Sequence, residues 1–163
     1  MKCLALVSLF LVAFNVGDAL AQQQAPRSPP PAYGAPITLD QAKIAVAAAE
    51  SEGARNGLNL AIAIVGPSGN LIYFQKADLA PNGAIEIAQD KARTSALFRR
   101  PSKVFMERLE KGQMFVMALR GAVPSAGGAP IIIGGRVIGA IGISGAAALQ
   151  DHAVAIAGAA AVK

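Results

Sequence analysis

Apolar residues along this chain recur with two periods, one near 3.6 residues and one of 2, which predicts both helices and strands. Helical spacing is found in four stretches, residues 38–57, 85–98, 102–112 and 147–162. Strand-like runs are found in five, residues 58–66, 71–77, 113–121, 129–133 and 136–145. Turn residues separate the first two runs and the last two, which indicates two hairpins. The pattern therefore predicts an α+β fold in which helices pack on a five-stranded antiparallel sheet.

The first 36 residues do not follow this pattern. Residues 1–21 begin with one lysine, continue as an apolar run and end in Ala-Leu-Ala, as secretory signal peptides do. The run is too short and wrongly flanked to span a membrane. Residues 22–36 are rich in proline, which favours an extended, disordered tether. We therefore expect an exported protein, periplasmic or secreted, whose folded domain covers residues 37–163.

Composition narrows the chemistry. The chain has 15 Lys and Arg against 10 Asp and Glu, a net charge of +5, so an acidic partner is expected. Export argues against nucleic acid as that partner. The single cysteine, Cys3, lies in the signal peptide, and the single histidine is His152. Catalytic triads and zinc sites need more such residues, so we assign no catalytic residue. His152 follows Asp151 and is either a solvated residue near a helix start or a ligand of a metal or haem.

The helix predicted at 85–98 is unusual because it carries a threonine among cations. Lys91, Thr94 and Phe98 fall on one stripe, and a cluster of cations lies near the end of the same stretch: Arg93, Arg99, Arg100 and Lys103. Such cations can interact favourably with the dipole at the C-terminal end of the helix, or they can bind a ligand. Glu86 and Asp90 share one face of the helix, where they fit solvated ion pairs better than acid–base catalysis.

Three ordered blocks make the chain resemble the GlcG/HbpS family of haem-binding proteins. They are Lys91 to Ser95 with the following Pro101-Ser102, the Gly-Gly-x-Pro-Ile turn at 127–131, and the glycine-rich run at 139–145. The resemblance covers about residues 37–162. It implies a profilin-like five-stranded sheet, haem as ligand, and homo-oligomers from dimer to octamer.

For the site, the resemblance implies that Thr94 ligates haem iron. His152 is the rival ligand, because imidazole is in general a better donor to haem iron than a hydroxyl. Hydroxyl oxygen is a hard donor that suits ferric iron. Phe98 would then cover the porphyrin, and four cations would face its propionates: Lys91, Arg93, Arg99 and Arg100. Some relatives use a histidine of the first helix, but residues 38–57 contain none.

We therefore expect an exported haem-binding protein that acts in haem or iron handling or in oxidative stress. Two alternatives stay open. One is an enzyme, either of peroxide-linked haem degradation or of small-carboxylate metabolism near Glu86 and Asp90. The other is an accessory subunit without catalytic activity.

Overall fold

The computed structural model describes residues 29–163, so the predicted signal peptide and residues 22–28 lie outside it. In chain order the elements are β1 (Ala32–Tyr33), α1 (Leu39–Arg55), β2 (Ala61–Val65), β3 (Leu71–Lys76), α2 (Ala84–Phe98), α3 (Lys103–Glu110), the 3-10 helix η2 (Met114–Ala118), β4 (Gly128–Ile133), β5 (Arg136–Ser144) and α4 (Ala148–Ala160). Within these residues, no helix combines the length and apolar character needed to cross a membrane.

The sheet is built around β5, its longest strand. β4 pairs with one edge of β5, and β2 pairs with the other, both antiparallel. β3 pairs with β2 and forms the outer edge. The two predicted hairpins, β2–β3 and β4–β5, are therefore confirmed. The α+β class with a five-stranded, mostly antiparallel sheet is confirmed as well.

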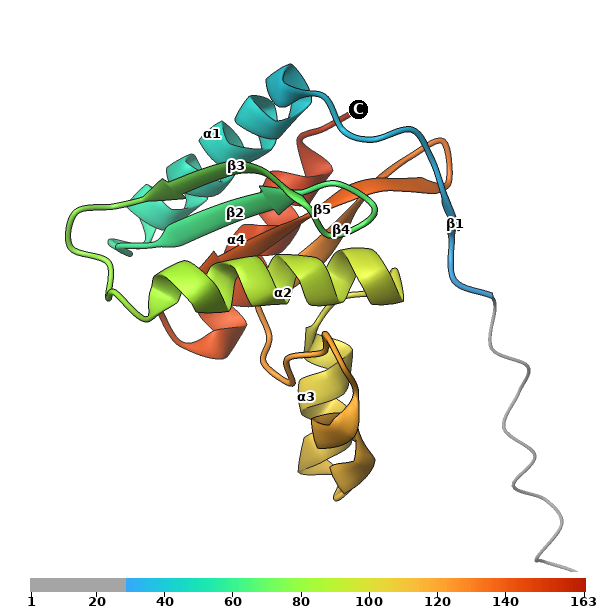
Figure 1. Cartoon of the computed structure of the whole chain (residues 1–163). Coiled ribbons are helices and arrows are strands. Elements are labelled where there is room, and N and C mark those ends of the chain that lie inside the picture. Colours follow the sequence, from blue (N-terminus) through green and yellow to red (C-terminus); the bar gives the residue numbers. More distant parts are fainter. Residues whose placement is uncertain (1–28) are drawn as a thin grey trace, which may run out of the picture.

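Helices cover both faces of the sheet, as Figure 1 shows: α2 lies on one face, and α1 and α4 lie on the other. The alternation along β2 explains this arrangement. Ile62 and Ile64 pack toward α1 and α4, whereas Ala61, Ala63 and Val65 pack toward α2. The α1 helix begins at a capping box, in which the side chains of Thr38 and Gln41 each accept from the backbone N–H of the other residue.

Small residues let α2 approach the sheet closely. Its buried face is a row of alanines, Ala84, Ala88, Ala92 and Ala96. Opposite them, β5 presents Gly142, and β4 begins with Gly128. A Cβ atom at either glycine would overlap the backbone of α2, at Ala88 and Lys91 respectively. The glycine-rich runs are therefore needed for close packing, not for a phosphate-binding loop.

One predicted strand is wrong. Residues 113–121 form the 3-10 helix η2 and an irregular segment, and η2 packs against α3. Only Val116 of η2 is buried. A strand on a sheet buries every second side chain, whereas this segment buries only one. A short helical turn therefore suits it better than a strand. We refer to residues 101–123 as the arm, because α3 projects away from the sheet on the side of α2 that faces away from it (Figure 1).

The prediction of a disordered tether at residues 22–36 is wrong for residues 29–36, the part of it that the structure describes. Ala32–Tyr33 form β1, which pairs with the start of β5 in parallel, so the sheet is not wholly antiparallel. The Tyr33 hydroxyl donates to the carbonyls of Ala96 (3.1 Å) and Leu97 (2.9 Å) at the end of α2. The described part of the proline-rich segment is therefore bound to the domain, and we call residues 29–36 the N-terminal strap. The sheet still has five strands, because β1 takes the place of the strand predicted at 113–121.

Candidate functional site

Lys91 forms a buried ion pair that joins α2 to α4. Its ammonium lies 2.7 Å from Asp151 Oδ2 and donates to the Ile143 carbonyl at 3.0 Å. The second oxygen of Asp151 accepts from the N–H of Ala146 at 3.1 Å. Burial raises the pKa of Asp151, and the contact with Lys91 offsets part of that rise. With 2% of its surface exposed, Lys91 has no free face for a ligand.

Thr94 is fully buried, and its hydroxyl has three backbone partners. Its hydrogen is shared between the Asp90 carbonyl (2.8 Å) and the Gly121 carbonyl (3.1 Å). Its oxygen accepts from the N–H of Val123 at 2.9 Å. The side chain thus fastens residues 121–123 to α2. Iron ligation by Thr94 stays a prediction, and in this arrangement it requires residues 121–123 to move away.

Ser102 fastens the other end of the same loop. Ser102 directly precedes α3, but its side chain makes no capping hydrogen bond to that helix. Instead its hydroxyl donates to the Ser125 carbonyl at 2.7 Å and accepts from the N–H of Gly128 at 2.8 Å. Ser95, also fully buried, has no hydrogen-bond partner within residues 29–163. The three blocks of the family pattern therefore meet at one place, where they hold the loop between the arm and β4.

Above this buried layer, the surface has a pocket of about 290 Å³ between α2 and the loop. Asp90, Arg93 and Leu97 line one side, and residues 121–123 line the other. Arg93 is not free, because it donates to Asp90 (3.1 Å) and to Gln89 (3.2 Å). The charge of Arg93, the one cation of this pocket, is therefore neutralised by Asp90. The apolar part of the pocket includes the exposed Leu97.

A second pocket, of about 320 Å³, runs along the arm and is cationic. Arg100, Arg108 and Lys111 line it together with Val104, Glu107 and Gln113. Its one carboxylate, Glu107, lies 3.4 Å from Lys103. Within residues 29–163, no ion pair uses Arg108 or Lys111. Sequence reasoning singled out Arg100 but missed Arg108 and Lys111, although their spacing from Val104 (i, i+4, i+7) places all three on one helix face.

Exposed apolar side chains lie on η2, which directly follows Gln113, a residue that lines this cationic pocket. Met114, Phe115 and Met117 of η2 are 66%, 54% and 62% exposed. Their helix is tied to α3, since the N–H of Gln113 donates to the Arg108 carbonyl at 2.9 Å. We call these three residues the η2 patch. Contiguous exposed apolar patches mark interaction sites in many proteins.

The other predicted site residues have structural partners. Arg99 lies over the ring of Tyr33, 5.0 Å from its centre, and donates to the Pro31 carbonyl at 3.0 Å. Phe98 packs edge-on against Phe105, with ring centres 4.9 Å apart. Arg99 therefore holds the N-terminal strap, and Phe98 fixes the base of the arm.

His152 is half-buried on α4, and its Nδ1 has no partner within the described residues. Burial lowers the pKa of His152, the nearby Lys103 lowers it further, and Glu107 opposes both. The histidine therefore faces the arm and favours the neutral form. No group of three or more acidic, histidine or cysteine side chains among residues 29–163 is arranged to hold a metal ion.

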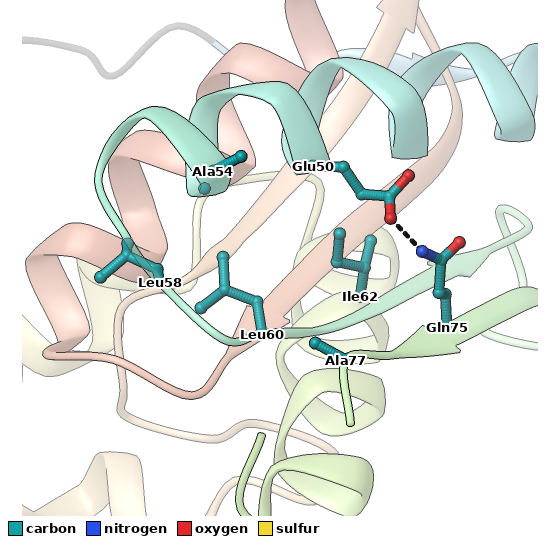
Figure 2. Close-up of a pocket in the computed structure, with 8 residues that line it drawn as sticks. Glu50, Ala54, Leu58, Leu60, Ile62, Gln75 and Ala77 are labelled. Atoms are coloured by element: carbon teal, nitrogen blue, oxygen red, sulfur yellow. Dashed lines mark hydrogen bonds between the residues drawn. The ribbon is translucent and has the colours of Figure 1, made fainter. Parts of the chain in front are cut away.

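A third pocket lies on the opposite side of the sheet, between α1 and β3. Figure 2 shows apolar side chains at its base, with Glu50 beside Gln75, whose amide donates to the carboxylate. Its volume of about 200 Å³ is below the roughly 300–1,000 Å³ typical of ligand sites. A carboxylate at the edge also disfavours anionic ligands, so this pocket does not fit an acidic partner.

The chain is similar in sequence to proteins of a known family. The model of the family "Haem degrading protein HbpS-like" matches residues 37–160. Protein GlcG of Escherichia coli K12 is 32% identical over 108 residues, which cover 66% of this chain and 81% of GlcG.

Solved structures with the same fold include HbpS and the PduOC–haem complex. The HbpS crystal structure has a TM-score of 0.74 and 28% identity, covering 85% of this chain and 99% of HbpS. The PduOC–haem complex has a TM-score of 0.71 and 20% identity, covering 78% and 96% of the two chains. At that identity, the second likeness shows the shared fold alone.

Proposed function

The chain belongs to the HbpS-like family of haem-degrading proteins, and from that premise we propose that its domain binds haem on the arm. The observation that carries the proposal is the cationic pocket beside the η2 patch. Haem is a planar apolar macrocycle with two carboxylates on one edge. A ligand of that kind needs apolar cover and cations side by side, and the arm offers both.

The arm residues fit haem in charge and in polarity. Arg108 and Lys111 are available for the propionates, and the guanidinium of Arg108 is placed over the Phe105 ring at 6.0 Å. Phe115 offers an aromatic surface for the macrocycle. Bound haem would supply redox-active iron, whereas the residues of the chain bind and orient it. By comparison, Lys91 and Thr94 lie below the surface and hold the fold under the neighbouring loop.

A hemin titration followed by visible absorption tests the proposal. The wild-type protein is expected to shift the Soret band of hemin with saturation at one equivalent per chain. Replacing two arm cations, in Arg108→Gln/Lys111→Gln, should weaken binding about tenfold or more, since two charge-assisted hydrogen bonds are lost. The matched control, Lys43→Gln/Arg55→Gln, removes the same charge from α1 on the far side of the sheet. No saturable shift with wild type, or equal weakening by both pairs, would contradict the proposal.

Export and a role in oxidative stress belong to the same proposal. The sequence supports export through the pattern of residues 1–21, which predicts that the mature chain begins at Gln22. Mass spectrometry of the protein from its native host checks this, and retention of Met1 would refute it. An oxidative role predicts that loss of the gene sensitises the host to hemin plus peroxide more than to peroxide alone.

We also expect a homo-oligomer, from dimer to octamer. The edge strand β3 carries Leu71 and Ile72, 45% and 37% exposed, and an edge strand with free backbone groups can pair with a second chain. Light scattering at micromolar concentration gives the mass directly. A monomer mass under those conditions would count against this expectation.

A further inference from the structure

The η2 patch is an apolar turn on the arm, and it has no role in the core of the domain. Met114, Phe115 and Met117 are exposed, whereas Val116 is fully buried. A 3-10 helix has three residues per turn, so a turn that directs Val116 toward the domain directs the other side chains away from it. The patch therefore presents its large apolar side chains to the surroundings of the protein.

Cations flank this apolar turn on both sides along the chain. Lys111 lies just before η2 and Arg120 lies just after it, and both are exposed. Neither forms an ion pair with another residue in the range 29–163. The chain has no Asp or Glu between Glu110 and Asp151, so no carboxylate follows the turn closely. The surface around η2 is consequently apolar with a positive border.

Such a surface fits a bilayer with anionic headgroups better than it fits a protein. Specific protein interfaces use about 20–30 residues a side, far more than one turn supplies. A bilayer, in contrast, accepts a few apolar side chains between its headgroups, and its negative surface attracts the cations beside them. The arm also projects on the side of α2 that faces away from the sheet, which lets η2 approach a flat surface (Figure 1).

We propose that the arm docks this protein on membranes that contain anionic lipids. Met114, Phe115 and Met117 enter the headgroup layer, and Lys111 and Arg120 bind the lipid phosphates. The association is peripheral, since no helix within residues 29–163 is long and apolar enough to cross a membrane. This inference goes beyond haem binding and does not depend on it, and the two ligands would use the η2 patch in turn.

Tryptophan fluorescence tests insertion directly. The chain has no tryptophan, so Phe115→Trp places a single indole in the patch. The chain from Gln22 onwards is used, because the apolar residues 1–21 would bind lipid themselves. With vesicles of phosphatidylcholine and phosphatidylglycerol, the emission should shift to shorter wavelength and be quenched by lipids brominated on their acyl chains. Leu79→Trp, at an exposed loop position before α2, is the control and should show neither change.

Vesicle sedimentation measures the contribution of the apolar side chains. Met114→Gln/Met117→Gln should weaken binding to the same vesicles about tenfold, because less apolar surface enters the bilayer. Both positions are exposed, so the fold is preserved. The matched control, Leu149→Gln/Ile156→Gln, removes two exposed apolar side chains from α4 and should bind as the wild type does.

The cations are tested in the same way. Lys111→Gln/Arg120→Gln should weaken binding about tenfold or more, since each cation near an anionic surface contributes about fivefold. Lys43→Gln/Arg55→Gln removes the same charge from α1 and is the control. No binding by the wild type, or equal losses in test and control pairs, would overturn the inference. An emission shift in Phe115→Trp that follows protein concentration without vesicles would overturn it too, because a second copy of the chain would then cover the patch.

Discussion

The ion pair between Lys91 and Asp151 is buried on both sides, with side chains 3% and 2% exposed. Removing one partner of such a pair leaves an uncompensated charge in the interior. Lys91→Met should therefore lower the free energy of unfolding by about 3–5 kcal/mol in urea denaturation. Adding Asp151→Leu should recover much of the loss, because the orphaned carboxylate is gone.

The control for this prediction is Lys103→Met, which breaks the half-exposed pair with Glu107. Surface pairs are worth about 0–1 kcal/mol, so this change should be mild. If the two lysine variants lose the same unfolding free energy, the buried pair of Lys91 and Asp151 does not stabilise the contact between α2 and α4.

His152 should make stability depend on pH. Burial and Lys103 lower its pKa in the folded state, so the unfolded chain binds the proton more readily. Stability is then highest above the ordinary histidine value of about 6.5 and falls as pH drops below it, levelling off below the folded pKa. His152→Gln should flatten this part of the curve of unfolding free energy against pH. An unchanged slope in that variant would mean that another group titrates.

Two of the residues that the sequence singled out as candidate haem contacts, Lys91 and Thr94, are buried. Lys91 and Thr94 were recognised as special members of α2. The partners that occupy them, Asp151 and Val123, lie 60 and 29 residues further along the chain, where no local pattern points to them. A helical stripe tells which side chains share a face, but only the fold decides whether that face is covered.

The contact of α2 with the sheet depends on the absence of a side chain at Gly142. Gly142→Ala would place a methyl group against the Ala88 carbonyl and the backbone of Ala92, which cannot yield without moving the helix. We expect a loss of about 3 kcal/mol or more in thermal or urea unfolding, at the upper end of overpacking effects. Gly83→Ala is the control, because its Cβ would meet nothing within 4 Å and its φ is −62°. A wild-type stability for Gly142→Ala would show that α2 sits farther from β5.

At the scale of elements, the sequence predicted best where local signals were strong. The capping box set the start of α1, and the glycine pair set the turn of the β4–β5 hairpin. It failed at 113–121, where β-branched and apolar residues imitate a strand while their packing partner is α3. It also missed β1, because hydrogen bonds of Tyr33 and Arg99 to distant parts of the chain outweigh the preference of proline for extended tethers.

Charge and apolar surface are unevenly distributed over the whole molecule. The arm carries cations and the η2 patch together, whereas the pocket between α1 and β3 carries a carboxylate. The net charge of +5 therefore has a specific consequence, since an acidic amphiphile is attracted to one side of the protein and not the other. The sequence predicted the acidic ligand and placed it on α2; we now propose that it lies one element further along.

Hydrogen–deuterium exchange of the full chain with and without hemin tests this placement most directly. Haem bound on the arm should slow exchange in residues 100–118, because it shields η2 and orders the cationic side chains of α3. Residues 43–58, beside the pocket of Figure 2, should exchange at the same rate in both states. Protection confined to 43–58 or to other parts of the chain, with none in the arm, would contradict haem binding at this site.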